Sequence, residues 1–381
     1  MVAFFISTLL LIIPFIAIVI LSLLTVSACL PSPRLAPVTK KQKYAIIIPS
    51  HNESLLIHET VKQALKQNYP VECYSVVVVA DNCTDDTAEK AALAGARVIE
   101  RHDKPGKGQA LKHALDLLLE EDWDGFLVVD ADSHLGSESV AEMNRLILNG
   151  KEVFQFRYGV LNPKESIRTR VFEFSMSSFN ALRLKGKHRL GISTGVNGNG
   201  FGFSRQVAIQ VPYLAHSIVE DIEYHMHLLR NDIKVAYSDV GNVFSQMPVT
   251  SKESESQRER WERGRIIMLQ TYVPEMFKRS MTGNTFALMA LLDVLMPPIS
   301  IIVLLLGMGT VVGGEASLTI ASVLMTLLVI HYFISACMYG SLKGLTIVAL
   351  YIPWYIIWKT YVLLKSLLMN KNLPWVRTER R

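Results

Sequence analysis

The chain has 381 residues, half of them apolar and only 19% charged, with a formal net charge of +5. Soluble domains carry about 25% charged residues, so this composition and the positive mean hydropathy favour a membrane protein. No long basic run with interleaved aromatic residues occurs, which argues against a nucleic-acid partner. The four cysteines form no CxxC pair, which argues against a zinc site or a disulfide framework.

Residues 1–33 contain no charged residue and include the apolar segment FFISTLLLIIPFIAIVILSLLTVSA. A helix needs about 20 residues to cross a bilayer, and a cleaved signal peptide would have a basic start and a shorter apolar core. Four basic residues follow between positions 34 and 43, and by the positive-inside rule this flank is cytoplasmic. We therefore expect an N-terminal transmembrane helix whose amino end lies outside the cell membrane.

Between residues 44 and 130, apolar segments alternate with segments of helical spacing. The apolar segments are near-continuous runs of Val and Ile: YAIIIPS, YSVVVVAD, ARVIER and GFLVVD. Strands of this kind, separated by helices, are typical of a mostly parallel sheet with helices on both faces. We therefore predict an α/β fold here, in which ligands bind beyond the carboxyl ends of the strands.

Polar residues follow three of these strands and should gather at one edge of the sheet: residues 50–53, Asp81, Asn82, Asp130 and Asp132. Asp130 and Asp132 would repel each other unless a cation lies between them. Mg²⁺ or Mn²⁺ is the expected ion, because hard cations bind one or two carboxylates together with substrate phosphates. The alternative is a solvated turn, since Asp and Ser favour turns.

Two common nucleotide-binding motifs, GxGxxG after the first strand and GxxxxGK[ST], are absent from the sequence, which argues against a dinucleotide-binding dehydrogenase and a P-loop NTPase. The glycine-dense segment 191–204 has neither spacing. It predicts either a flexible loop or a surface that a bulky ligand approaches closely.

The C-terminal third is again apolar. Two spans are predicted at 294–314 and 316–340, divided by a turn at 313–315. Two lysines interrupt the segment 345–368, so it either crosses the bilayer or lies in its interface, and the basic tail that follows favours the interface. The segment 262–283 is apolar at helical spacing and is predicted to lie in the interface as well.

Seven motifs occur in one order between about residues 44 and 265: IIIPSHNE, VVVVADNCTDDT, KPGKGQALKHAL, VVDADS, GNGFGFSR, VEDIEYHMHL and SQRERWERGR. In these motifs and their order the chain resembles the membrane-bound family 2 glycosyltransferases, the group that includes cellulose, chitin and hyaluronan synthases. The last motif has the QxxRW spacing of that group. The resemblance implies a GT-A-like fold and transfer of a sugar from a UDP-sugar to a growing glycan or a lipid-linked acceptor, in polysaccharide biosynthesis.

The resemblance also implies residues on the donor side: Pro49, Glu53, Asp81 and Lys107 on or near the nucleotide, and Asp130 and Asp132 on the diphosphate. Asp81 matches the family aspartate that contacts the uracil. Asp132 matches the second aspartate of the DxD pair, which holds the Mg²⁺ or Mn²⁺ ion. Taken alone, Lys107 is a solvated loop charge.

On the acceptor side, Asp221 matches the catalytic base of the family, with Glu220 beside it. Gln257, Arg260 and Trp261 match the group that covers the diphosphate and borders the acceptor. A carboxylate that accepts the proton of the attacking hydroxyl contributes about 10²–10⁴-fold, and in-line attack inverts the anomeric centre. The alternatives are an acid in the first turn of a helix for Asp221 and a basic helix on acidic lipid for QRERWERGR.

Two departures from the family pattern leave other functions open. Val219 stands where the family has a hydroxyl residue before the Glu-Asp pair, and the predicted spans number three, or four at most, too few for a secretion channel in one chain. A single-addition glycolipid-forming transferase and a catalytically silent scaffold subunit of a glycan synthase remain alternatives. A nucleotidyltransferase shares the sheet but does not explain QxxRW. Oligomers and partner subunits stay open.

The chain is thus predicted to be an integral membrane protein in five parts: an N-terminal transmembrane helix (1–33), a cytoplasmic GT-A-like domain (34–261), an interfacial amphipathic helix (262–283), C-terminal transmembrane or interfacial helices (284–369) and a basic cytoplasmic tail (370–381).

Overall fold

The computed structural model describes residues 2–31, 35–215, 217 and 219–368, and among these it leaves out the side chains of residues 2, 4, 251–263, 265, 363, 364 and 366–368. The chain divides into two units. The sheet unit comprises Pro31–Asn162 and Ile192–Met247, and the helical unit comprises Met1–Leu30, Pro163–Gly191 and Pro248–Arg381. The helical unit thus includes a segment, Pro163–Gly191, that the sequence did not set apart from the domain predicted at 34–261.

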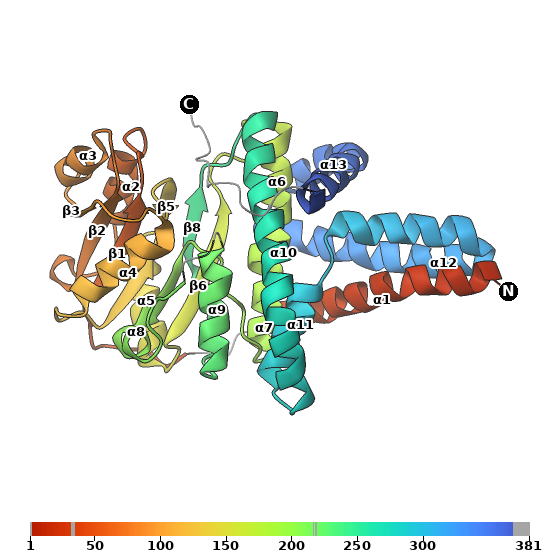
Figure 1. Ribbon diagram of the computed structural model, residues 1–381, viewed down its shortest axis with the longest axis horizontal. Helices are drawn as coiled ribbons and strands as arrows, with labels where there is room; N and C mark the ends of the chain where they lie inside the picture. The colour runs from red at the N-terminus through yellow and green to blue at the C-terminus, as the bar shows by residue number, and fades with distance from the viewer. Residues whose placement is uncertain (1, 32–34, 216, 218, 369–381) are drawn as a thin grey trace. The chain divides into compact units, whose positions relative to one another are not determined.

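Eight strands form one sheet in the sheet unit (Figure 1): β1 (Tyr44–Ser50), β2 (Tyr74–Asp81), β3 (Arg97–Arg101), β4 (Gly125–Val128), β5 (Ser133–Leu135), β6 (Val153–Val160), β7 (Phe201–Ser204) and β8 (Ala236–Ser245). Their order is β3-β2-β1-β4-β7-β6-β8-β5. The first four are parallel to one another, β7 is antiparallel to β4 and β6, and β5 is antiparallel to β8. The predicted mostly parallel sheet is confirmed.

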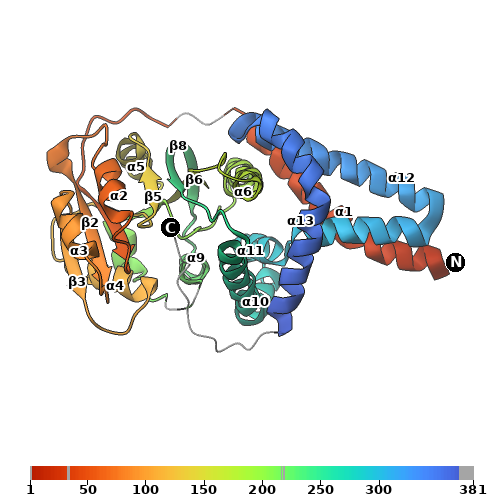
Figure 2. The ribbon, with the colours of Figure 1, turned by 90° about the horizontal axis from the view of Figure 1, so that it is seen from above.

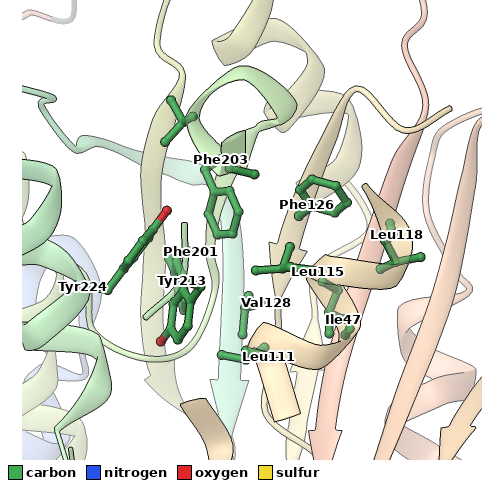
Figure 3. Close-up of a cluster of buried hydrophobic side chains, with 14 of the residues drawn as sticks. Ile47, Leu111, Leu115, Leu118, Phe126, Val128, Phe201, Phe203, Tyr213 and Tyr224 are labelled. Atoms are coloured by element: carbon green, nitrogen blue, oxygen red, sulfur yellow. The ribbon is translucent and has the colours of Figure 1, made fainter. Parts of the chain in front are cut away.

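Helices cover both faces of this sheet: α2 (Ile57–Ala64), α3 (Thr87–Leu93) and α5 (Ser139–Leu148) on one, and α4 (Lys107–Leu118), α8 (Arg205–Gln210) and α9 (Glu220–Arg230) on the other. A short 3₁₀ turn, η1 (Val71–Cys73), precedes β2. The burial of β1 shows why its sequence is continuously apolar. Ala45 and Ile47 lie in the core under α4, whereas Ile46 and Ile48 lie in the core under α2. The α4 side is shown in Figure 3, where Ile47 lies beside Leu111 and Leu115.

The helical unit consists of helices alone within the described residues: α1 (Val2–Cys29), α6 (Ile167–Ser177), a π-helical turn η2 (Ser178–Leu182), α7 (Arg183–Arg189), α10 (Ser251–Met281), α11 (Thr285–Leu295), α12 (Ile299–Tyr339) and α13 (Leu342–Leu368). In the part of the chain that the structure describes, three segments are long and apolar enough to cross a membrane: Phe5–Cys29, Ile299–Tyr339 and Leu342–Val362. The predicted tail at 370–381 lies outside the described residues.

Helices α1 and α12 form a small bundle because α12 folds back on itself. Its backbone leaves the helical region at Gly314 (φ 70°, ψ −154°), within the turn predicted at 313–315, and the two arms run side by side with α1 (Figures 1 and 2). Ser7 joins α1 to the tip of this hairpin, where its hydroxyl donates to the Gly309 carbonyl at 2.9 Å. At the other end, His331 is hydrogen-bonded through both ring nitrogens, to Thr25 at 2.6 Å and Ser178 at 2.7 Å.

Helix α13 differs in orientation from the bundle. It packs against α6, α10 and α12, and Figure 2 shows it crossing the direction of α1 and α12. The ring centres of Tyr355 and Trp358 lie 5.8 Å apart on this helix with the rings tilted by 36°, and the Arg168 guanidinium of α6 lies 5.7 Å from the centre of the Trp358 ring. Leu342–Val362 is also long and apolar enough to cross a membrane, so whether the segment 345–368 crosses the bilayer or lies in its interface stays a prediction.

Candidate active site

The carboxyl ends of β1, β2 and β4 bring three of the motifs, IIIPSHNE, VVVVADNCTDDT and VVDADS, to one edge of the sheet. Pairing places Ser50 beside Ala80 at the ends of β1 and β2, and Val128 beside Ile47 in β4 and β1. Strand β7 is antiparallel to β4, so the segment that precedes it reaches the same edge. The Asp130 backbone N–H accordingly donates to the Asn199 side-chain oxygen at 3.0 Å. The polar strand ends therefore meet there, as the parallel pattern predicts.

Asp81 is held in place by a buried ion pair with Arg101. Asp81 is only 4% exposed, and its carboxylate accepts hydrogen bonds from Arg101 Nη1 at 2.5 Å and from the Gly106 backbone N–H at 2.9 Å. Arg101 also donates to the Lys104 carbonyl at 2.8 Å. Asp81 therefore anchors the loop that leads to Lys107, besides any contact with a ligand.

The sequence analysis did not identify Arg101 as a site residue, because its pairing with Asp81 depends on β3 lying next to β2 in the sheet. The two residues face each other across β2 and β3 in the parallel register. Had β3 been placed next to β2, the matching ends of VVVVAD and RVIER would have shown this pair. A charged residue that is 6% exposed and paired with a candidate site residue is a structural part of the site.

The predicted nucleotide-side residues Pro49 and Glu53 lie on β1 and on the turn after it. The Glu53 backbone N–H donates to the Thr87 hydroxyl at 2.8 Å, and the Thr84 backbone N–H donates to the Asn52 side chain at 2.8 Å. Asn52 has a positive φ of 54°, a conformation that Asn tolerates better than most residues. These bonds join the turns after β1 and β2 beside Asp81.

Lys107 connects three of the predicted motifs. Its ammonium group donates to Asp130 Oδ1 at 2.6 Å and to the Gly198 carbonyl at 2.6 Å, and it lies 3.5 Å from Glu220 Oε1. Burial alone would lower the pKa of Lys107, but the charges of Asp130 and Glu220 outweigh it and hold the pKa above its ordinary value. Lys107 therefore stays charged and is not the solvated loop residue of the alternative interpretation.

Glycines allow the three motifs to approach Lys107 closely. A Cβ at Gly108 would lie 1.9 Å from the Ala215 carbonyl oxygen, so only glycine lets the start of α4 meet the chain before α9. Gly198 has a φ of 72°, and a Cβ there would lie 3.1 Å from Asp221 Oδ2. The glycine-dense segment thus lets other parts of the chain approach closely, and its approach by a bulky ligand stays a prediction.

Asp221 lies in the first turn of α9, where its Oδ1 accepts from the Ile222 backbone N–H at 2.9 Å. Burial and the neighbouring charge of Glu220 raise the pKa of Asp221 to about 7, against the opposing effect of Lys107. A carboxylate that is half protonated near neutral pH can accept a proton in a reaction and release it afterwards. This electrostatic property distinguishes Asp221 from an ordinary first-turn acid.

Asp132 lies at the turn between β4 and β5, and its position is fixed by a polar network. It accepts from the Ser133 hydroxyl at 3.0 Å, and Ser133 in turn is bonded to Ser245 at 2.6 Å. The Asn199 amide donates to both hydroxyls, at 2.8 and 2.9 Å. Asn199 was not predicted from the sequence, because an asparagine in a glycine-rich segment signals a turn rather than a support for the DxD pair.

The oxygen ligands at this turn fit a hard divalent cation that is shared with a substrate. Within the described residues, no group of three or more His, Cys, Asp or Glu side chains is arranged to hold a metal ion. Asp81, Asp132 and Asp221 are therefore not common ligands of one ion. Mg²⁺ and Mn²⁺ are often held by one or two carboxylates plus phosphate oxygens, and a half-exposed Asp132 suits that arrangement.

Three predicted residues lie in the helical unit instead. Gln257, Arg260 and Trp261 belong to α10 by their backbone, but their side chains lie outside the described residues. The structure therefore brings together Asp81, Lys107, Asp130, Glu220 and Asp221 with their supports in the sheet unit, and gives no side-chain contact for the QxxRW group.

Known proteins are similar to this chain in sequence and in fold. The family model described as "Glycosyltransferase like family 2" matches residues 41–264. A probable glycosyltransferase of Bacillus subtilis (strain 168), YdaM, is 24% identical over 248 residues, which is 62% of this chain. The chain spans 58% of the length of that relative.

Among solved structures, the mannosyltransferase PcManGT of Pyrobaculum calidifontis, in complex with GDP-Man and Mn²⁺, matches with a TM-score of 0.60 and 15% identity over 96% of this chain and 98% of its own. Glucosyl-3-phosphoglycerate synthase of Mycobacterium tuberculosis matches with a TM-score of 0.41 and 17% identity over 58% of this chain and 76% of its own. The first likeness shows the GT-A-like fold. Because the family model covers more than half of the chain, this protein belongs to glycosyltransferase-like family 2.

Proposed function

We propose that this protein is an inverting, divalent-metal-dependent transferase that moves a sugar from a UDP-sugar to a glycan or lipid-linked acceptor at a membrane. The observation that carries the proposal is the assembly around Lys107, which joins the DxD aspartate Asp130, the glycine segment at Gly198 and the acidic pair at Glu220. The Lys107 ammonium group thus meets two carboxylates and one backbone carbonyl at this edge of the sheet.

The reaction follows from the charges at this edge. The acceptor oxygen forms a bond to the anomeric carbon as the bond from that carbon to the diphosphate oxygen breaks, and the acceptor proton passes to Asp221. Its pKa of about 7 suits this task. A bound Mg²⁺ or Mn²⁺ ion would neutralise charge on the leaving diphosphate, with Asp132 as its protein ligand. Lys107 holds Asp130 and Glu220 so that two carboxylates can lie beside a polyanionic substrate.

The donor nucleotide is assigned to uridine through Asp81. Its carboxylate is fixed by Arg101 and the Gly106 N–H at the strand end, beside the turns that carry Pro49 and Glu53. A fixed carboxylate can accept a hydrogen bond from the uracil N3–H. The solved mannosyltransferase of this fold holds GDP-Man with Mn²⁺, which supports a nucleotide sugar and a divalent cation in this architecture but names a different base.

The membrane parts are proposed to act as an anchor. The helices at 1–33 and 284–369 hold the enzyme at the cell membrane, the segment 262–283 lies along the interface, and the domain at 34–261 faces the cytoplasm. The bundle of α1 and α12 has an interior filled with apolar side chains, among them Ile18, Leu21, Ile302 and Leu306. In the described part of the chain, this filled interior favours addition to a lipid-linked acceptor over extrusion of a polymer through the bundle.

The donor is tested by incubating the purified full-length protein with UDP-glucose, UDP-N-acetylglucosamine, other UDP-sugars and GDP-mannose, and measuring the nucleotide released. We expect UDP from at least one UDP-sugar in Mg²⁺ or Mn²⁺ and none after addition of a chelator. Release of GDP alone would contradict the uridine assignment, and release of pyrophosphate would indicate a nucleotidyltransferase. Binding of UDP without turnover would support the scaffold alternative.

The pH dependence follows from Asp221. The carboxylate must be unprotonated to accept a proton, and its pKa is raised to about 7. The turnover number kcat is therefore expected to rise with pH through about 7 with a slope of one proton, rather than to be flat above pH 5 as an ordinary aspartate would give. An initial-rate series between pH 5 and 9 at saturating donor measures this limb, and a profile without a transition near neutrality would contradict Asp221 as the base.

A further inference from the structure

A pair of buried cations lies in the helical unit, on α7. Arg183 and Lys187 are one helical turn apart, and each is only 7% exposed. Both contact one carboxylate, Asp293 of α11: Lys187 Nζ lies 2.7 Å from Asp293 Oδ2, and Arg183 Nη2 lies 3.4 Å from Asp293 Oδ1. The described part of this cluster therefore contains two positive charges for one negative charge.

The guanidinium of Arg183 has an unused donor in the described part of the chain. Its Nε is buried and has no hydrogen-bond partner in the described part of the chain, and the bond from Nη2 to Asp293 is long at 3.4 Å. The Phe179 ring faces the guanidinium at 4.8 Å and supplies no acceptor oxygen. Burial lowers the pKa of Lys187, Asp293 opposes this and Arg183 adds to it. Among the described side chains, the cluster thus contains no second anion with several acceptor oxygens.

Contacts with α1 and α11 place this cluster where the apolar spans end. A Cβ at Gly186 would lie 2.2 Å from the Leu24 carbonyl, so α7 crosses α1 near the end of the span Phe5–Cys29. Ser27 also donates to the Gly186 carbonyl at 3.2 Å. Asp293 precedes the span that begins at Ile299. If these spans cross the bilayer, Arg183 and Lys187 lie at the depth of lipid headgroups.

The chain around the pair is strongly basic. Residues 167–189 contain six Lys or Arg residues and one acidic residue, Glu173. The Phe179 ring is 53% exposed beside Arg183, as expected for an aromatic side chain at a membrane interface. Such a segment attracts anionic lipid, and the buried pair adds a defined position for one phosphate.

We propose that Arg183 and Lys187 bind the phosphate group of an anionic phospholipid, with the headgroup phosphate completing the donors that Asp293 leaves unused. Arginine presents a planar fork of N–H donors that matches phosphate oxygens, and the lysine adds a point charge one turn away. The site rests on the proposed membrane anchoring and is separate from the transfer reaction in the sheet unit. Its role is to fix α7 and α11 at the headgroup level when such a lipid is present.

The competing explanation is a purely structural ion cluster, and Asp293 separates the two. In a structural cluster, Asp293→Asn removes the carboxylate that pairs with both cations in the described part of the chain, and weakens the protein in every lipid. In a phosphate site, the negative charge of Asp293 partly neutralises the two cations and repels a phosphate beside them, so Asp293→Asn strengthens retention of the anionic lipid. The two explanations therefore predict opposite effects on lipid binding.

Native mass spectrometry of the full-length protein, with phosphatidylglycerol and phosphatidylcholine added to the detergent in equal amounts, measures this retention. We expect the wild type to retain phosphatidylglycerol preferentially, and Arg183→Gln to weaken that retention by about tenfold or more, as expected for a lost charge-assisted hydrogen bond. Arg183→Lys, which keeps the charge and removes the fork, should weaken it as well. Lys185→Gln, which removes one charge from a less buried position of the same helix, should change it by less than about threefold.

Equal retention of phosphatidylglycerol by the wild type, Arg183→Gln and Lys185→Gln would overturn the proposal, as would weaker retention in Asp293→Asn. Thermal stabilisation of the detergent-solubilised protein by inorganic phosphate to the same extent as by phosphatidylglycerol would show a free-phosphate site and overturn the lipid assignment. UDP release is measured on the same samples. An inactive protein that still discriminates between the two lipids would count against the proposed transferase and not against this site.

Discussion

Asp221→Asn is expected to lower kcat by about 10²–10⁴-fold while the affinity for the UDP-sugar and the metal ion changes little, because the asparagine keeps the shape of the side chain and cannot accept the proton. Stability should not fall with activity. The raised pKa of Asp221 means that the folded protein binds a proton that the unfolded chain has released between about pH 4 and pH 7. Stability therefore declines as pH rises through that window, and the asparagine removes this decline.

The measurement for this variant is kcat and the donor KM from UDP release, together with thermal unfolding at pH 5 and pH 8. Asp232→Asn is a matched control, because Asp232 is exposed beyond the end of the same helix and has a φ of 55° that asparagine accepts. The control should retain wild-type kcat. An Asp221→Asn variant with full activity, or one whose loss is entirely in KM, would contradict a role as base.

Lys107→Met is expected to reduce kcat/KM by about 10²-fold or more, comparable to removing a preorganised charge from an active site. The substitution keeps the length of the side chain but leaves Asp130 and Glu220 without the shared cation. Lys107 lowers the pKa of Asp221, so its loss should raise that pKa further. The acid limb of the pH–rate profile should therefore move to higher pH, which a simple loss of folding would not produce.

Lys112→Met provides the comparison for this prediction. Lys112 lies on the same helix and pairs with Asp116 at 2.5 Å on the surface, so its loss should cost at most about 1 kcal/mol and leave the pH profile in place. Initial rates of both variants between pH 5 and 9 decide the matter. A Lys107→Met profile with the wild-type midpoint would show that Lys107 does not act on Asp221.

The sheet and its active edge were predictable because local sequence determines both. Continuous Val and Ile runs require two covered faces, and β1 shows this directly, with Ile47 buried on one side and Ile48 on the other. Parallel strands also place their carboxyl ends together, so Asp81 and Asp130 could be assigned to one edge before any coordinates were available.

Long-range partners could not be predicted in the same way. Arg101 meets Asp81 only because β3 pairs with β2 in the sheet. Asn199, which lies 66 residues from Ser133 in the sequence, holds the turn at Asp132 through a hydrogen bond to Ser133. Helices α6 and α7 interrupt the sheet unit in the sequence and are basic, yet they belong to the helical unit. They belong to it because they pack against its apolar helices, and not because they are apolar themselves. Hydropathy finds spans, but not the polar helices that lie against their ends.

The central claim is that one edge of the sheet holds the donor and separates two tasks: Asp132 binds the metal ion with the diphosphate, and Asp221 accepts the proton. Isothermal titration calorimetry, in which UDP is titrated into the full-length protein in the presence of Mn²⁺, tests this division directly. The account predicts that Asp132→Asn weakens UDP binding by about tenfold or more, whereas Asp221→Asn binds UDP as the wild type does. Binding that does not depend on Mn²⁺, or that Asp221→Asn weakens as much as Asp132→Asn, would contradict it.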